Sequence, residues 1–209
     1  ELGRLYAARD ARLRSRVENQ LVGLAQNLRE FEMLAGYLDF ARTRYAVPEN
    51  PWLRQLFGAR QNAPFSEVLD KAPQLTEKFM ALRRGVGPGA ETPMDPDFAA
   101  ISTLLHELDA AASDATALAL FPPGASGEEA WLTPADLVTR VFSGEPLSAQ
   151  HRALLMSLER LVTLADDAAG FAEEWSAFST ALVAQARQRG EYRKIGLEAA
   201  YYRARFFHY

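Results

Sequence analysis

Two acidic pairs stand seven residues apart in the C-terminal half of the chain, Asp166-Asp167 and Glu173-Glu174. Paired carboxylates on a helix can hold magnesium and, through it, a diphosphate, as they do in all-α prenyl-chain enzymes. Such an enzyme needs a second acidic cluster across a cavity, and the sequence has no matching motif. The pairs also fall opposite the apolar stripe of their helix. We therefore expect a solvated face, with neither a metal site nor a cofactor.

The other residue types that carry chemistry are scattered. None of the three histidines, His106, His151 and His208, has a second histidine or a glutamate at metal-ligand spacing on its own helix. The glycine-rich stretch 85–89 follows a predicted helix rather than a strand, so it predicts a linker and not a phosphate loop. The absence of cysteine excludes disulfides, thiol nucleophiles and cysteine–zinc sites. These patterns favour a protein that is not an enzyme.

Aromatic residues with a few polar neighbours could form a ligand pocket, because binding cavities are mostly apolar with a small number of orienting polar groups. The predicted ligand-binding residues are Trp131, Arg140, Phe142, His151, Trp175 and Phe178. Arg140 or His151 would be the polar anchor. Core packing explains the aromatic residues equally well, and we expect Trp175 itself to be a core residue.

The charge distribution is uneven along the chain. Residues 1–16 carry a net charge of +3 and residues 187–209 a net charge of +4, so the overall −4 leaves −11 for the residues between them. Basic ends and an acidic middle are the least generic feature of the composition. If helices in antiparallel order bring both ends to one pole, Arg12, Arg14, Arg203 and Arg205 would face an anionic membrane surface.

Tyrosines, phenylalanines and basic residues are interleaved in the last segment, 192–209. This pattern fits stacking on nucleic-acid bases, a position at lipid headgroups, or a core-facing aromatic helix with arginines at its rim. The acidic overall charge disfavours nucleic acid as a partner. The membrane and structural interpretations both remain.

Helical periodicity must position all of these residues. Between Leu154 and Ala186 apolar residues recur every three or four positions, which predicts one long helix over 147–188. The same spacing predicts a first helix over residues 2–45. Its apolar stripe consists of Leu13, Val17, Leu21, Leu24, Leu28, Phe31, Ala35 and Leu38.

Further helices are predicted between these two. Short helices are expected after Pro51, over 66–71 and over 73–84, followed by the linker at 85–93. Asp95 predicts the start of a helix that reaches Phe121, and Thr133 with Asp136 forms a capping box that opens a short one. Ser148 is the expected N-cap of the long helix over 147–188.

These elements predict an all-α chain, an elongated up-down bundle of about four long helices with short helices in the connections. We expect a single domain over 1–209, with 48–94 as an alternative short-helix insert. No apolar run approaches the roughly 18 residues that span a bilayer.

In its general architecture the chain resembles the helical input modules of bacterial membrane receptors. That resemblance implies a non-enzymatic sensor or protein-interaction domain of a bacterial membrane-associated protein, with the periplasmic side favoured over the cytoplasmic side. The expected partners are a protein or a small-molecule ligand, an anionic membrane surface, or a second copy in a homodimer. The alternatives are a soluble adaptor that docks a basic protein and, less favoured, an all-α diphosphate enzyme.

Overall fold

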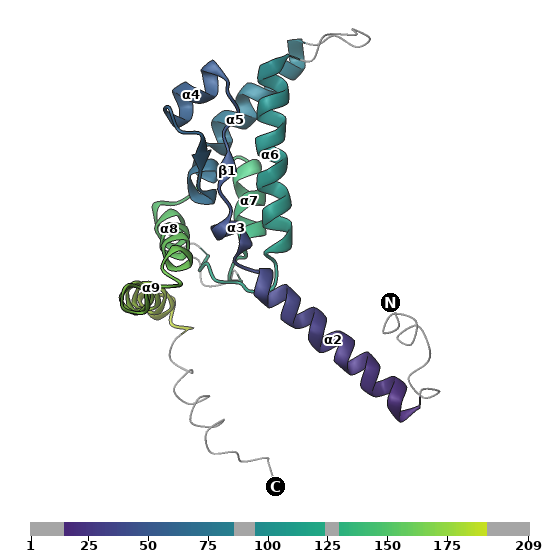
Figure 1. Cartoon of the computed structure of the whole chain (residues 1–209). Coiled ribbons are helices and arrows are strands. Elements are labelled where there is room, and N and C mark those ends of the chain that lie inside the picture. Colours follow the sequence, from purple (N-terminus) through teal and green to yellow (C-terminus); the bar gives the residue numbers. More distant parts are fainter. Residues whose placement is uncertain (1–14, 86–94, 124–129, 192–209) are drawn as a thin grey trace.

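The computed structural model describes residues 15–85, 95–123 and 130–191 (Figure 1). The protein is mostly helical, with 73% helix and 4% strand over these residues, which confirms the predicted all-α class. A four-helix up-down bundle is not confirmed.

The elements follow in the order α2, α3, β1, α4, β2, α5, α6, α7, α8 and α9. Their bounds are α2 Arg16–Gly36, α3 Asp39–Arg42, β1 Tyr45–Ala46, α4 Pro51–Phe57, β2 Asn62–Ala63, α5 Phe65–Gly85, α6 Pro96–Asp114, α7 Pro134–Phe142, α8 Ala149–Thr163 and α9 Ala168–Gln188. The two short strands pair antiparallel, with Tyr45 opposite Ala63.

The core lies where α5, α6 and α7 meet, with α3 and α8 against it. Aromatic rings fill the region near α3, where Phe40 and Phe65 meet edge to face at 5.0 Å between ring centroids. The largest fully buried side chains are Tyr37, Phe40, Tyr45, Leu53, Phe65, Leu69, Leu75, Ile101, Leu104, Leu108, Phe121 and Leu137. Because α5 and α8 both contribute to this core, polar residues at the ends of these helices are held at fixed positions.

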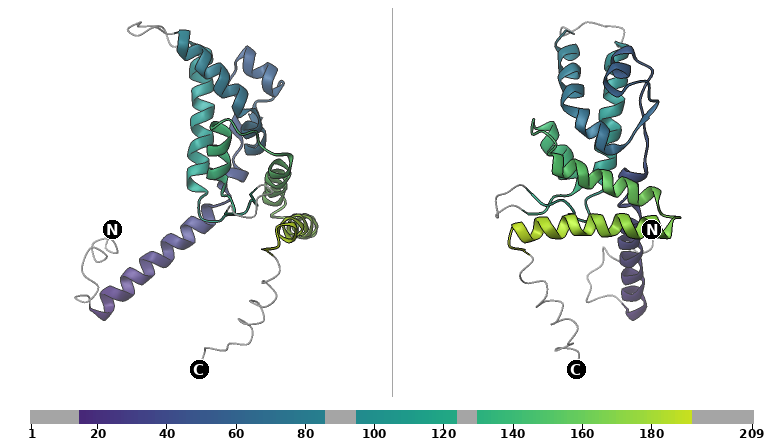
Figure 2. Two further views of the ribbon diagram at one scale, coloured as in Figure 1. Left: turned by 180° about the vertical axis from the view of Figure 1, so that it is seen from behind. Right: turned by 90° about the vertical axis from the view of Figure 1, so that its left-hand side faces the viewer.

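The predicted helix over 147–188 is wrong as a single rod, because the chain forms two helices with a break at 164–167. The Asp167 side chain accepts a hydrogen bond from the Gly170 backbone N–H at 3.1 Å and caps a new helix there. The two helices then pack against each other, as the side view in Figure 2 shows. Periodicity did not reveal the break, since two helices that share one apolar interface keep the three–four spacing across it.

Other helix boundaries also differ from expectation. The first helix ends at Gly36 instead of continuing to residue 45, and the helix that starts after Asp95 ends at Asp114, well before Phe121. The two short helices expected over 66–84 form one continuous α5 that contains Pro73. The predicted helix starts are confirmed, because Asp95, Thr133 and Ser148 each cap a helix with their side chains.

Helix α2 projects away from the remaining helices in every view (Figures 1 and 2). A capping box between Ser15 and Glu18 fixes its start. Val22 is its only buried residue, and the helix packs extensively against no other described element. The predicted apolar stripe of this helix therefore faces outward over most of its described length.

Candidate functional site

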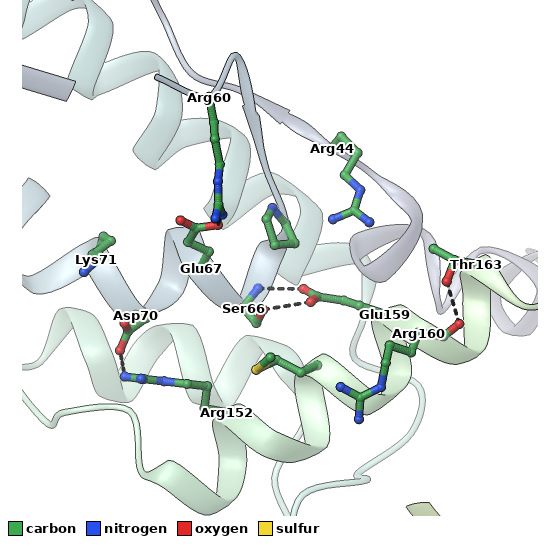
Figure 3. Close-up of a pocket in the computed structure, with 12 residues that line it drawn as sticks. Arg44, Arg60, Ser66, Glu67, Asp70, Lys71, Arg152, Glu159, Arg160 and Thr163 are labelled. Carbon is green, nitrogen blue, oxygen red and sulfur yellow. Dashed lines mark hydrogen bonds and ion pairs between the residues drawn. The ribbon is translucent and has the colours of Figure 1, made fainter. Parts of the chain in front are cut away.

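One pocket among the described residues lies between the first turns of α5 and the middle of α8, and it is lined mainly by charged side chains (Figure 3). Its volume is about 540 Å³, within the roughly 300–1,000 Å³ of small-molecule sites. The lining side chains come from α5, α8, the segments before β1 and β2, and the link between β2 and α5. They are Arg44, Arg60, Pro64, Ser66, Glu67, Asp70, Lys71, Arg152, Met156, Glu159, Arg160 and Thr163.

A buried carboxylate organises this pocket. Glu159 is only 6% exposed, and Ser66 donates to it twice, from its backbone N–H to Oε1 and from its hydroxyl to Oε2, each at 2.7 Å. Pro64 precedes α5 and has no side-chain acceptor, so the carboxylate of Glu159 caps the first turn of α5 from another helix. Burial raises the pKa of Glu159, while the two hydrogen bonds from Ser66 and the charge of Arg44 act in the opposite direction.

Four of the eight charged side chains that line the pocket form ion pairs with one another. Arg60 pairs with Glu67 at 2.8 Å, and Arg152 pairs with Asp70 across the gap between α8 and α5 (Figure 3). Arg160 instead forms two hydrogen bonds to Glu174 on α9, at 2.9 and 3.0 Å.

Two cations in the pocket are left over. Among the residues that the structure describes, Arg44 and Lys71 have no ion-pair or hydrogen-bond partner. Arg44 lies on the side of the pocket nearer Glu159, whereas Lys71 lies at the other end, near Asp70 (Figure 3). A cation without a protein partner suits a small anion.

The predicted ligand-binding residues do not form one site. Arg140 and His151 line a second, smaller pocket of about 200 Å³ at the end of α7. The ring Nε2 of His151 lies 2.7 Å from the Pro122 carbonyl oxygen, so this nitrogen is engaged in a local hydrogen bond. None of the four predicted aromatic residues lines this pocket.

These four aromatic residues are dispersed. Trp131 donates from Nε1 to the Glu191 carboxylate at 2.8 Å, and Phe142 lies exposed at the end of α7. Trp175 is 53% exposed on α9, whereas its neighbour Phe178 is 3% exposed, with the two ring centroids 6.0 Å apart. The expectation that Trp175 is a core residue is wrong. The single stripe on α9 is only partly covered, because α8 is the only described helix packed extensively on it.

The four residues of the two acidic pairs have different environments in the structure. Asp166 and Glu173 are exposed, and Asp167 is the N-cap of α9. Glu174 was predicted to lie on a solvated face. Its carboxylate instead accepts hydrogen bonds from Arg160 and from the Ser157 hydroxyl. These two donors lower the pKa of Glu174. In the described ranges no three aspartate, glutamate or histidine side chains converge as metal ligands.

The residues predicted to face a membrane, Arg12, Arg14, Arg203 and Arg205, lie outside the described residues. No helix in 15–85, 95–123 or 130–191 combines the length and apolarity of a bilayer span.

A second candidate site is the outward face of α2. Seven large apolar side chains of this helix are exposed, namely Val17, Leu21, Leu24, Leu28, Phe31, Met33 and Leu34, with exposed fractions of 37–68%. Five of them belong to the stripe that periodicity predicted, but the sequence placed that stripe inside a bundle. Only the tertiary arrangement shows that the stripe is accessible. No protein-family model, curated protein or solved structure matches the chain.

Proposed function

We propose that the protein is a non-enzymatic protein-interaction module and that α2 is its docking helix. The observation that carries the proposal is the run of exposed apolar side chains along a projecting helix. Exposed contiguous apolar surface of this kind marks interaction sites in soluble proteins. An amphipathic helix whose apolar positions recur at three–four spacing binds a groove or another helix with that face.

The apolar area of this helix is large enough to offset the cost of binding a protein partner. Burying one leucine-sized side chain contributes about 1.5–3 kcal/mol, so four of them would contribute roughly 6–12 kcal/mol. That range is comparable with the cost of association, about 4–15 kcal/mol. Most of the stability of a helix in a protein comes from packing of its apolar face, so α2, with 21 residues, gains from a partner that covers that face.

Site-specific photocrosslinking tests the proposal. A photoreactive phenylalanine analogue at Leu24 should form a protein adduct in the source cells, because Leu24 is 66% exposed on the apolar face. The same analogue at Gln26, which is exposed on the opposite side of α2, is the matched control and should form none.

A stability measurement decides against the proposal if the face is internal. At a protein concentration low enough for the parent chain to be monomeric, L24Q/L28Q should unfold in urea like the parent, since exposed substitutions usually change stability by less than about 0.5 kcal/mol. A loss as large as that of a core substitution would show that α2 packs within its own chain.

A ligand-sensing role is the second candidate, favoured by Arg44 and Lys71 in the charged pocket. A small phosphate or carboxylate would pair with either of these cations. Calorimetry with inorganic phosphate and with citrate tests this role. Binding should weaken in R44Q and K71Q but not in R54Q, which alters an exposed arginine outside this pocket. No heat of binding for the parent chain would exclude it.

A further inference from the structure

The exposed side chains of α2 fall into a heptad repeat. Val17, Leu24 and Phe31 are seven residues apart, and Leu21, Leu28 and Ala35 form a second series of the same period. In heptad notation these are the d and a positions, which form the contact line of a coiled coil. We call these six residues the seam.

The seam runs the length of α2 and is accessible. Its three d positions hold the most exposed of the large apolar side chains of the helix, Val17 at 63%, Leu24 at 66% and Phe31 at 68%. The a positions Leu21 and Leu28 are 37% and 55% exposed. No described helix runs beside α2 in any view, so another helix has room along it (Figures 1 and 2).

The geometry points to a second copy of this chain as the partner. We propose that the seam of one α2 packs against the seam of another in a parallel two-stranded coiled coil, an inference that rests on α2 being the docking helix. A seam of strict period seven matches an identical seam layer by layer when two helices run in parallel. Three heptads, the length of α2, are the lower end of what defines a coiled coil.

The charges beside the seam favour the parallel orientation. The e positions hold Glu18, Ala25 and Glu32, and the g positions Gln20, Asn27 and Leu34 are neutral. In a parallel pair each g position faces an e position of the other helix, which places no two like charges together. In an antiparallel pair the e positions face each other, so Glu18 would lie against Glu32 of the other copy twice. Like charges across a helix pair are destabilising.

Cysteine crosslinking tests the inference with little background, because the chain has no native cysteine. L21C and F31C are introduced separately into the full chain, with Q26C as the control off the seam. In a parallel coiled coil L21C links to L21C and F31C links to F31C. Under mild oxidation, more than half of the molecules of each variant should form the disulfide-linked dimer. Q26C should stay largely uncrosslinked. Light scattering of the parent chain should give twice the monomer mass of 23.2 kDa, and L24Q/L28Q should be monomeric.

The other outcomes are distinct. If L21C and F31C crosslink only when mixed, the copies are antiparallel and the parallel assignment is wrong. If the parent chain is monomeric and no seam cysteine crosslinks, a second copy is not the partner. In that case adducts from Leu24 to another protein would still support α2 as the docking helix. If L24Q/L28Q unfolds the chain, the docking role itself fails.

Discussion

Glu159 on α8 accepts two hydrogen bonds from Ser66 at the start of α5, although 93 residues separate them in the chain. Both oxygens of the carboxylate are engaged, one by the backbone N–H and one by the hydroxyl. The contact fixes the first turn of α5 to the middle of α8. It also determines the floor of the charged pocket, so the stability of the fold and the shape of the pocket depend on the same pair (Figure 3).

Removing the carboxylate should therefore destabilise the protein. E159A leaves the Ser66 N–H and hydroxyl without their acceptor, and an unsatisfied buried donor costs about 1–3 kcal/mol. S66A should cost less, because the backbone N–H keeps its bond. Urea unfolding followed by circular dichroism measures both. E173A, which alters an exposed glutamate, is the control and should remain within about 0.5 kcal/mol of the parent.

The pH dependence of stability should report on the same carboxylate. Burial raises the pKa of Glu159 in the folded state above the ordinary glutamate value. The folded state then binds this proton more tightly than the unfolded state, so the contribution to stability is fully present below the ordinary value and is lost as pH rises through the raised pKa.

Comparison with E159Q isolates this effect, because the titration of the other groups cancels. The difference in unfolding free energy between parent and E159Q should fall as pH rises across that window. A difference that is constant, or one that grows with pH, would contradict the raised pKa. Unfolding in urea at a series of pH values provides the measurement.

The two neighbouring aromatic residues of α9 should differ sharply in their effect on stability. Phe178 is 3% exposed, and F178A should cost about 3–5 kcal/mol, the range for a buried phenylalanine. Trp175 is 53% exposed, so W175A should cost clearly less than F178A. Thermal unfolding of the two variants side by side tests this order. Equal losses would mean that Trp175 is covered in solution.

The charge map predicts association with anionic lipids. Each basic residue near the headgroups contributes about 1 kcal/mol, so the two basic ends should bind anionic vesicles at low salt and release them at high salt. Co-sedimentation with anionic and with neutral vesicles is the measurement, and the variant with Arg12, Arg14, Arg203 and Arg205 replaced by glutamine should lose binding. Equal binding to both kinds of vesicle would count against this prediction.

The sequence by itself determined the helical class and the local starts of helices. Thr133 with Asp136, Asp95 and Ser148 were recognisable as caps because a cap depends on residues within one turn. The apolar stripe of α2 was equally readable, since periodicity shows which residues share a face.

Only the tertiary structure determined which elements pack against the apolar face of each helix. Periodicity could not separate α8 from α9. It also placed both Trp175 and the seam of α2 in a core, because an apolar stripe shows which residues share a face and does not show whether another element packs on that face. The cap that Glu159 provides to Ser66 had no local signal, since its two partners lie on different helices. The pocket beside them depends on the same packing, in which α5 and α8 bring distant charges within contact distance.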